Sequence, residues 1–106
     1  MSFGVMGANM QPQGHVQTLV RMIDFGQSPQ AACDAPRWRW NRGLALNVEP
    51  HWPPAIIAGL RARGHEIEEL HDAYQDFGAG QFIWKLPGRG YVAASDPRRD
   101  GQAVGF

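Results

Sequence analysis

The chain has 106 residues, and its ten Lys and Arg residues balance its ten Asp and Glu residues, so its formal net charge is zero. This length supports one domain with a modest core. Zero net charge offers neither nucleic acid nor an anionic membrane a broad electrostatic attraction. The longest apolar runs span only a few residues and no basic, hydrophobic leader follows Met1, so we expect no membrane span or signal peptide. Both the bacterial cytoplasm and the periplasm remain open.

The first third of the sequence predicts one strand and two helices. Residues 3–7 are apolar and punctuated by glycine, which predicts a short strand, and residues 8–14 then read as a loop. Residues 16, 19, 20 and 23 are apolar at the spacing of one helix face, which predicts a helix that buries this stripe. Ser28 and Pro29 then open a second helix, which Pro36 ends early.

The rest of the sequence favours strands. Residues 44–48 alternate between larger apolar and smaller side chains, as a half-buried strand does. Residues 52–64 predict a third helix that opens on two prolines and closes at Gly64, and residues 65–70 predict a short strand. Residues 81–86 and 91–94 form a hairpin around a Pro-Gly turn. The predicted fold class is α+β, with helices on one face of a mainly antiparallel sheet in a single domain over residues 1–106.

Metal binding and cysteine chemistry find little support. The four histidines are scattered and the single cysteine has no CxxC partner, so we expect no metal site and no cofactor. Cys33 lies in mid-helix next to Asp34, where a cysteine is usually a small buried apolar residue. A neighbouring carboxylate raises the pKa of a thiol, which opposes a nucleophilic role.

Residues 37–40 alternate arginine with tryptophan and Arg42 follows, a pattern that allows two interpretations. Trp38 and Trp40 would share one face of an extended segment, and Arg37 and Arg39 the other. Tryptophan and arginine stack on nucleotide bases, but a strand packed on a core and lined by solvated charges has the same pattern. Because the net charge is zero, we favour the strand and expect no nucleic-acid partner.

The segment from Gly7 to His15 is the strongest local candidate for a site. It joins the predicted strand to the predicted helix, and its small residues allow a ligand to approach the backbone closely. Successive N–H groups before a helix favour an anion or an oxyanion. The segment has no GK[ST] and matches no phosphate-binding fingerprint.

Several motifs in order along the chain resemble the γ-glutamyltranspeptidase family, and especially its γ-glutamyltransferase-like branch. They are GVMGANMQPQGHVQ at residues 4–17, MIDFG at 22–26, PQA at 29–31, DAPRW at 34–38, LRARGH at 60–65, FGAGQ at 77–81 and ASDPRRDGQAVGF at 94–106. The resemblance covers almost the whole chain. It implies the C-terminal portion of the small subunit of an N-terminal-nucleophile hydrolase, whose fold is an αββα sandwich.

The resemblance also implies where the chemistry lies. In the family, a threonine at the start of the small subunit attacks an amide, forms an acyl-enzyme and passes the acyl group to water or an amine. Thr18 is the only threonine here and sits inside a predicted helix, so the resemblance assigns the nucleophile to a segment upstream of Met1. We therefore expect no catalytic side chain in these residues and no activity of the chain alone.

What the resemblance assigns to this chain is an oxyanion site. Gly7 and Ala8 match a Gly-Gly pair whose backbone N–H groups stabilise the tetrahedral intermediate, although alanine does not adopt a positive φ easily. The adjoining candidates for a substrate pocket are Asn9, Gln11, Gln13 and His15, of which His15 either lines the pocket or closes the loop. Residues 96–99 look functional because they form a family hallmark, but Asp-Pro turns and Asp–Arg pairs are also architectural, and we favour architecture there.

The expected partner is the rest of a parent amidase, meaning the upstream small-subunit segment and the large subunit. The expected substrate of that parent is a γ-glutamyl compound such as glutathione, or another amide as in the cephalosporin-acylase-like members. A non-catalytic binding module, or a separate subunit that meets its partner in trans, is the alternative. We also expect the isolated chain to form homo-oligomers, because a domain cut from a sandwich exposes apolar surface; the expected contacts are Phe82, Trp84 or the face of Trp38 and Trp40.

Overall fold

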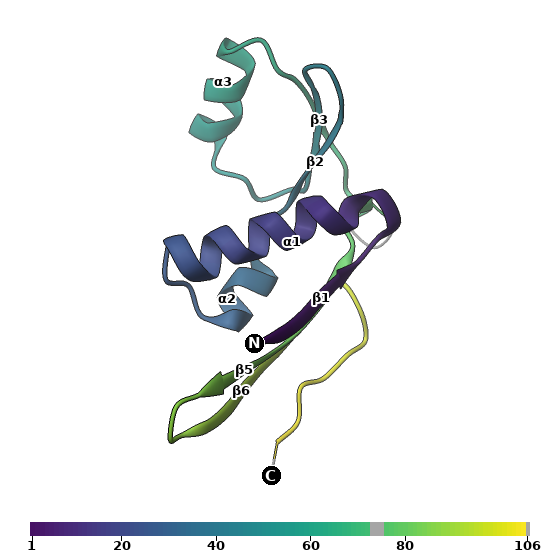
Figure 1. Cartoon of the computed structure of the whole chain (residues 1–106). Helices are drawn as coiled ribbons and strands as arrows, with labels where there is room; N and C mark the ends of the chain where they lie inside the picture. Colours follow the sequence, from purple (N-terminus) through teal and green to yellow (C-terminus); the bar gives the residue numbers. More distant parts are fainter. Residues whose placement is uncertain (73–75, 106) are drawn as a thin grey trace.

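The computed structural model describes residues 1–72 and 76–105, and it is elongated, with extents of 47 × 26 × 21 Å (Figure 1). The strands are β1 (Ser2–Met6), β2 (Trp38–Arg42), β3 (Ala45–Val48), β4 (Glu66–Glu69), β5 (Ala79–Leu86) and β6 (Gly90–Ser95). The helices are the 3₁₀ helix η1 (Ala8–Met10), α1 (Gln11–Leu19), the π-helix η2 (Val20–Asp24), α2 (Pro29–Asp34) and α3 (Pro54–Ala62). None of the helices in these two ranges is both long and apolar enough to cross a bilayer.

The first sheet is antiparallel, with strand order β1-β5-β6. Its side chains alternate between two faces, and one face carries Val5, Phe82 and Ala94, which are all buried. These three side chains pack with Cys33 of α2 into the main core cluster. Phe82 is only 1% exposed, so the predicted role of Phe82 as a contact between copies is wrong.

The second sheet has the order β2-β3-β4 and lies at the other end of the molecule (Figure 1). β2 and β3 pair antiparallel, whereas β3 and β4 pair parallel with α3 as the connection between them. Parallel neighbours need such a crossover, and a helix usually provides it. The α+β class and the antiparallel pairing around β5 are confirmed, but the strands divide between two sheets rather than joining one. Trp38 and Trp40 line one apolar groove with α3, as their alternate spacing predicted.

The predicted loop over residues 8–14 is shorter in the structure. η1 begins at Ala8 and α1 follows at Gln11, so only Gly7 separates β1 from helical backbone. Pro12 lies in the first turn of α1, where a missing N–H costs nothing because the first amides of a helix have no partner in it. Pro12, which falls in the loop that the sequence predicts, therefore belongs to the first turn of α1.

The orientation of α1 is the reverse of the prediction. Val16 and Ile23 are 56% and 64% exposed, whereas the opposite face, with Gln17 and Thr18, is buried. The buried face also includes Gly14, where an added Cβ would lie 2.7 Å from Val5 Cγ1. The close approach of helix to strand through Gly14 and Val5 thus contributes to which side of α1 faces inward.

Glutamine side chains on helices complete the edges of both sheets. The Gln17 amide donates to the Trp38 carbonyl at 2.8 Å and accepts from the Trp38 N–H at 3.1 Å, and Gln13 makes the same pair of bonds with Trp40 at 3.1 and 2.7 Å. The two spacings match, because four helical residues rise about 6.0 Å and two strand residues about 6.6 Å. α1 therefore takes the place of a further strand beside β2, and Gln30 of α2 pairs with the Ser95 backbone in the same way.

The second predicted helix is confirmed at both ends. The Ser28 hydroxyl accepts from the Ala31 N–H at 3.2 Å, and Pro29 occupies the first turn of α2. The helix ends at Asp34, and Ala35 before Pro36 has extended backbone. These local signals act within a few residues, so they could be read directly from the sequence.

Candidate functional site

The turn between β1 and α1 is built on two residues with positive φ. Gly7 has φ 144° and Ala8 has φ 48°. Ala8 therefore adopts the left-handed conformation, although alanine rarely has a positive φ. The Met10 N–H donates to the Gly7 carbonyl at 2.8 Å and closes the turn. Within the described ranges, no hydrogen bond has the Gly7 or Ala8 N–H as its donor. The turn therefore presents two adjacent backbone N–H groups that have no acceptor among the residues the structure describes.

Gly78 packs directly against this turn. A Cβ on Gly7 would lie 2.9 Å from the Gly78 Cα, and a Cβ on Gly78 would lie 2.1 Å from the Met6 carbonyl oxygen. Gly78 also has φ 69°, which favours glycine. The two backbones thus approach as closely as two residues without side chains allow, and the position of Gly78 determines the position of the Gly7 turn.

A buried ion pair holds the segment that contains Gly78. Arg37 and Asp96 are fully buried and their Nη2 and Oδ2 atoms are 2.7 Å apart. Arg37 Nη1 donates to the carbonyl oxygens of Phe77 and Gly78, both at 3.0 Å. Asp96 Oδ2 accepts from the Gly80 N–H at 2.6 Å. The pair therefore fixes residues 77–80 on both sides of the point where the chain meets the turn.

A second arginine extends this cluster. Arg98 Nη2 and Nε each lie 2.5 Å from a Glu49 carboxylate oxygen, and Arg98 Nη1 lies 3.1 Å from Asp96 Oδ1. Arg98 also donates to the carbonyl oxygens of Cys33 and Ala35 at the end of α2. The expectation that residues 96–99 serve the architecture is confirmed for Asp96 and Arg98. Arg37 and Arg98 donate hydrogen bonds to the buried Asp96 carboxylate and so compensate its negative charge.

The cluster changes the pKa values of its members. Burial alone would raise the pKa of Asp96, but the Arg37 guanidinium and the Gly80 N–H hold it below its ordinary value. Burial would lower the pKa of Arg98, and the Glu49 carboxylate holds it above the ordinary value instead. Burial raises the pKa of the Cys33 thiol to about 12, and the Asp96 carboxylate, 3.6 Å from Sγ, adds to the rise. Cys33 is thus the inert buried residue that the sequence predicted.

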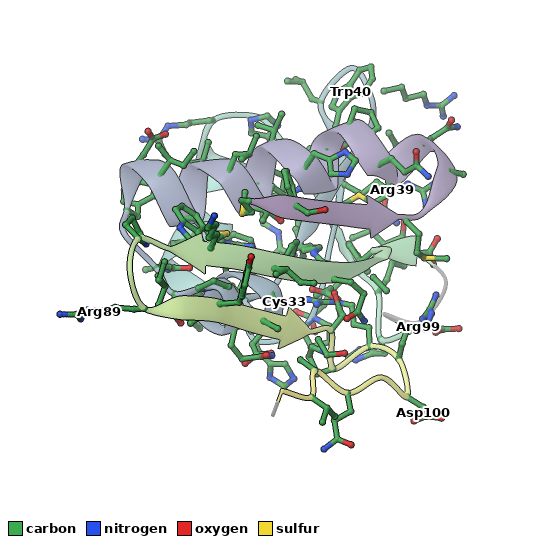
Figure 2. The ribbon with its side chains drawn as sticks, turned by 60° about the horizontal axis from the view of Figure 1, so that its bottom comes forward. Cys33, Arg39, Trp40, Arg89, Arg99 and Asp100 are labelled. Atoms are coloured by element: carbon green, nitrogen blue, oxygen red, sulfur yellow. The ribbon has the colours of Figure 1, made fainter. Side chains whose placement is uncertain are left out.

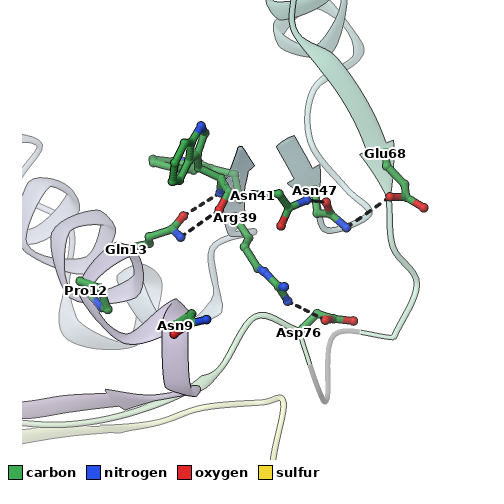
Figure 3. A pocket seen from close by; sticks show the side chains of 10 residues that line it. Asn9, Pro12, Gln13, Arg39, Asn41, Asn47, Glu68 and Asp76 are labelled. Carbon is green, nitrogen blue, oxygen red and sulfur yellow. Dashed lines mark hydrogen bonds and ion pairs between the residues drawn. The ribbon is translucent and has the colours of Figure 1, made fainter. Parts of the chain in front are cut away.

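Beside the turn, between the start of α1 and the second sheet, lies a cavity of about 800 Å³ (Figure 3). Its residues come from the start of α1, from β2, β3 and β4, and from the approach to β5: Asn9, Pro12, Gln13, Trp38, Arg39, Trp40, Asn41, Asn47, Glu68 and Asp76. Arg39 pairs with Asp76 at 2.8 Å, and each of these side chains is about one-third exposed. Asn41 donates to Asn47, whose amide reaches Glu68 Oε2 at 3.5 Å. The cavity therefore offers amide groups and charges of both signs to a polar ligand.

The structure separates the residues proposed for a substrate pocket. Asn9 and Gln13 line the cavity, although the Gln13 amide is already paired with the Trp40 backbone. Gln11 is exposed and does not line it. His15 Nε2 accepts from the Val5 N–H at 3.0 Å, and its ring meets Phe3 edge-on at a centroid distance of 5.3 Å. Of the two roles left open for His15, these contacts favour fastening α1 to β1.

The sequence did not reveal the residues that support the Gly7–Ala8 turn. Gly78 and Arg37 lie 70 and 29 positions along the chain from Ala8, and only the fold brings them to it. The signal that was available was the glycine-containing run at residues 77–81, together with an arginine that lies between Pro36 and Trp38. Across the described ranges, no three His, Cys, Asp or Glu side chains gather in a way that could hold a metal ion.

Comparison with known protein families gives a match over the whole chain. A family model described as gamma-glutamyltranspeptidase matches residues 1–106. Among curated proteins, a glutathione hydrolase-like proenzyme of Bacillus subtilis is 35% identical over 98% of the chain, and an oxamate amidohydrolase proenzyme of Klebsiella pneumoniae is 34% identical over 100% of it. The chain spans 21% of each of these relatives, or about a fifth of their length.

Solved structures contain the same fold. The chain superposes on a cephalosporin acylase from Bacillus halodurans with a TM-score of 0.90 and 49% identity, covering 98% of this chain and 19% of the acylase. A gamma-glutamyltranspeptidase from Pseudomonas nitroreducens gives a TM-score of 0.78 at 24% identity, covering 98% of this chain and 53% of that one. At this lower identity the likeness concerns the fold alone.

Proposed function

This chain belongs to the gamma-glutamyltranspeptidase family, and we propose that it forms the C-terminal part of an amide-cleaving enzyme of that family. Its partner in this proposal is the rest of the parent enzyme, which carries the nucleophilic threonine. Thr18 is 1% exposed inside α1, so a nucleophile has to come from elsewhere. The proposal concerns residues 1–106 as one segment of a longer catalytic unit.

The observation that carries the proposal is the pair of unpartnered N–H groups at Gly7 and Ala8. When the nucleophile adds to an amide carbonyl, the oxygen becomes an oxyanion, and preorganised donors stabilise it more than they stabilise the substrate. Gly78 and the Arg37–Asp96 pair hold these donors in place before the reaction. The threonine hydroxyl displaces the amine of the substrate amide and forms the acyl-enzyme, and water or an acceptor amine then takes the acyl group and frees the threonine. The side chains of this segment exchange no proton in this scheme.

The substrate class has two candidates. A γ-glutamyl compound such as glutathione is the first, because the family model and the Bacillus subtilis relative both point to γ-glutamyl chemistry. The second is an amide of the kind that a cephalosporin acylase cleaves. It is favoured by the 49% identity to the Bacillus halodurans acylase, against 24% to the Pseudomonas nitroreducens transpeptidase.

The first test uses the chain by itself. We expect the 106-residue polypeptide to turn over none of γ-glutamyl-p-nitroanilide, glutathione, oxamate and a cephalosporin amide. Release of p-nitroaniline or free amine above the buffer rate would contradict the proposal that the nucleophile lies outside this segment.

The second test uses a chimera, in which this chain replaces the matching segment of the Bacillus halodurans acylase. We expect the chimera to cleave one of the four substrates, and Ala8→Pro, which removes one N–H donor, to lower its kcat by about a hundredfold or more. Because proline fixes φ near −65° and Ala8 has φ 48°, the KM and Tm of this variant are measured beside kcat, to separate the loss of the donor from a distortion of the turn. Ala8→Gly keeps the N–H and relieves the positive φ, so its kcat should stay close to that of the chimera while its stability rises by about 1 kcal/mol. An Ala8→Pro chimera with full kcat would refute the oxyanion role.

A further inference from the structure

The outer face of α1 and η2 carries an apolar stripe that nothing in the described structure covers. We define the α1–η2 stripe as Val16, Val20, Ile23 and Phe25. Ile23 is 64% exposed and Phe25 is 74% exposed, which is the inverse of an ordinary amphipathic helix on a sheet. Isolated surface apolar residues are common, whereas a contiguous row of them marks an interaction surface.

The π-helix brings Phe25 into the row. In an α-helix, residues five apart point in different directions. In η2 the Phe25 N–H donates to the Val20 carbonyl, five residues earlier, at 3.1 Å. This wider turn ends at Phe25, directly after η2, where the aromatic side chain is 74% exposed. π turns of this kind are rare and are often found at functional sites, and here the turn extends the stripe by a large aromatic side chain.

α1 cannot roll over to bury the stripe within this chain. Such a rotation would break the pairs of hydrogen bonds between Gln17 and Trp38, and the bond from the Val5 N–H to His15. It would also replace Gly14 with a larger side chain at a contact where even a Cβ would lie 2.7 Å from Val5. The outward orientation of the stripe is therefore a fixed property of the fold.

We propose that the α1–η2 stripe docks on an apolar face of the part of a family protein that lies outside this chain. The stripe has no charged member, so it fits an apolar surface such as a helix face or a hydrophobic groove. The chain spans about a fifth of its curated relatives, and the fold recurs inside a larger acylase chain with a TM-score of 0.90. The larger proteins thus have the additional chain that could cover the stripe.

This inference rests on the proposed function, because it assigns the docking surface to the same parent enzyme. The test measures how readily a cysteine in the stripe is alkylated. Ile23→Cys is made in the isolated chain and in the acylase chimera, and its reaction with a maleimide is followed by mass spectrometry. The native Cys33 is buried and its pKa is raised, so it contributes little background below pH 8.

The matched control is Arg89→Cys, because Arg89 is exposed and projects outward from the tip of the β5–β6 hairpin (Figure 2). We expect Ile23→Cys to react at the rate of an exposed thiol in the isolated chain. In the chimera it should react at least about tenfold more slowly, and its protection should exceed that of Arg89→Cys. Equal protection at the two sites would overturn the proposal. Protection that appears only in the isolated chain, at high concentration, would assign the stripe to a second copy and would also overturn it.

The failure of docking and the failure of the proposed function have different signatures. A chimera with a protected stripe and no amidase activity supports the docking surface and contradicts the proposed function. An active chimera with a freely labelled stripe does the reverse. Ile23→Lys gives a second readout: it should leave the Tm of the isolated chain unchanged and lower the Tm of the chimera, and a chimera whose Tm is also unchanged would overturn the docking surface.

Discussion

Among single residues, Gly78 shows most directly how a positive φ and the lack of room for a Cβ together require glycine. Its φ of 69° is almost the same as the 67° of Gly88 in the β5–β6 hairpin, but the surroundings differ. A Cβ on Gly78 would lie 2.1 Å from the Met6 carbonyl oxygen, whereas a Cβ on Gly88 would meet nothing within 4 Å. The two positions therefore separate the cost of a left-handed backbone from the cost of a collision.

We predict that Gly78→Ala destabilises the chain by about 3 kcal/mol or more, since β1 and β5 have to separate to admit the methyl group. Gly88→Ala should cost only about 1 kcal/mol, which is the backbone contribution. Urea denaturation of both variants against the parent measures the difference. Equal losses would mean that the turn relaxes freely and that Gly78 does not fix the position of Gly7.

At the scale of secondary structure, α1 contacts β2 through hydrogen bonds from glutamine side chains of the helix to backbone groups of the strand. Gln17 is only 6% exposed, and removing its amide would leave the N–H and the carbonyl of Trp38 without partners. A buried backbone group that loses its partner costs about 1–3 kcal/mol. The edge of β2 would also become open to pairing with another strand.

We predict that Gln17→Leu lowers the free energy of unfolding by about 2 kcal/mol despite the gain in apolar surface. Gln11→Leu, at an exposed position of the same helix, is the control and should change stability by less than about 0.5 kcal/mol. Chemical denaturation followed by tryptophan fluorescence reports both. A Gln17→Leu variant as stable as the parent would show that water replaces the lost bonds.

The elements differ in how far the sequence could predict them. The capped start and proline-limited end of α2 and the Pro-Gly hairpin depend on neighbours in sequence, and they were predicted correctly. The orientation of α1 was not, because it depends on bonds between Gln17 and Trp38, which lie 21 residues apart. The position of the oxyanion candidates came from a resemblance. Their support by Gly78 and Arg37 needed the fold, since no local pattern links them to Ala8.

For the whole molecule, the buried charges set the dependence of stability on pH. The pKa of Asp96 is lower in the folded chain than in the unfolded one, where it is about 3.9. The unfolded state therefore binds the proton first as the pH falls. The stabilisation from Asp96 is complete above the unfolded pKa and is lost as the pH falls from there through the folded pKa.

We predict that the free energy of unfolding falls steeply below pH 4 in the parent and much less steeply in Asp96→Asn. At pH 7 the variant should already be less stable by about 3 kcal/mol or more, because Arg37 keeps a buried charge without its partner. Urea titrations between pH 2 and pH 7 test both statements. Parallel pH profiles for the two proteins would show that Asp96 does not cause the acid sensitivity.

The contacts of Arg37 affect how the molecule unfolds. Its side chain binds the carbonyl oxygens of Phe77 and Gly78 beside the first sheet, while its backbone N–H donates to Glu49 and its carbonyl accepts from Trp52 Nε1 beside the second. One residue thus belongs to both ends of an elongated body. Neither sheet can lose its structure without releasing groups that the other sheet requires. We therefore expect the two halves to melt as a single cooperative unit, in spite of the separate sheets from which they are built.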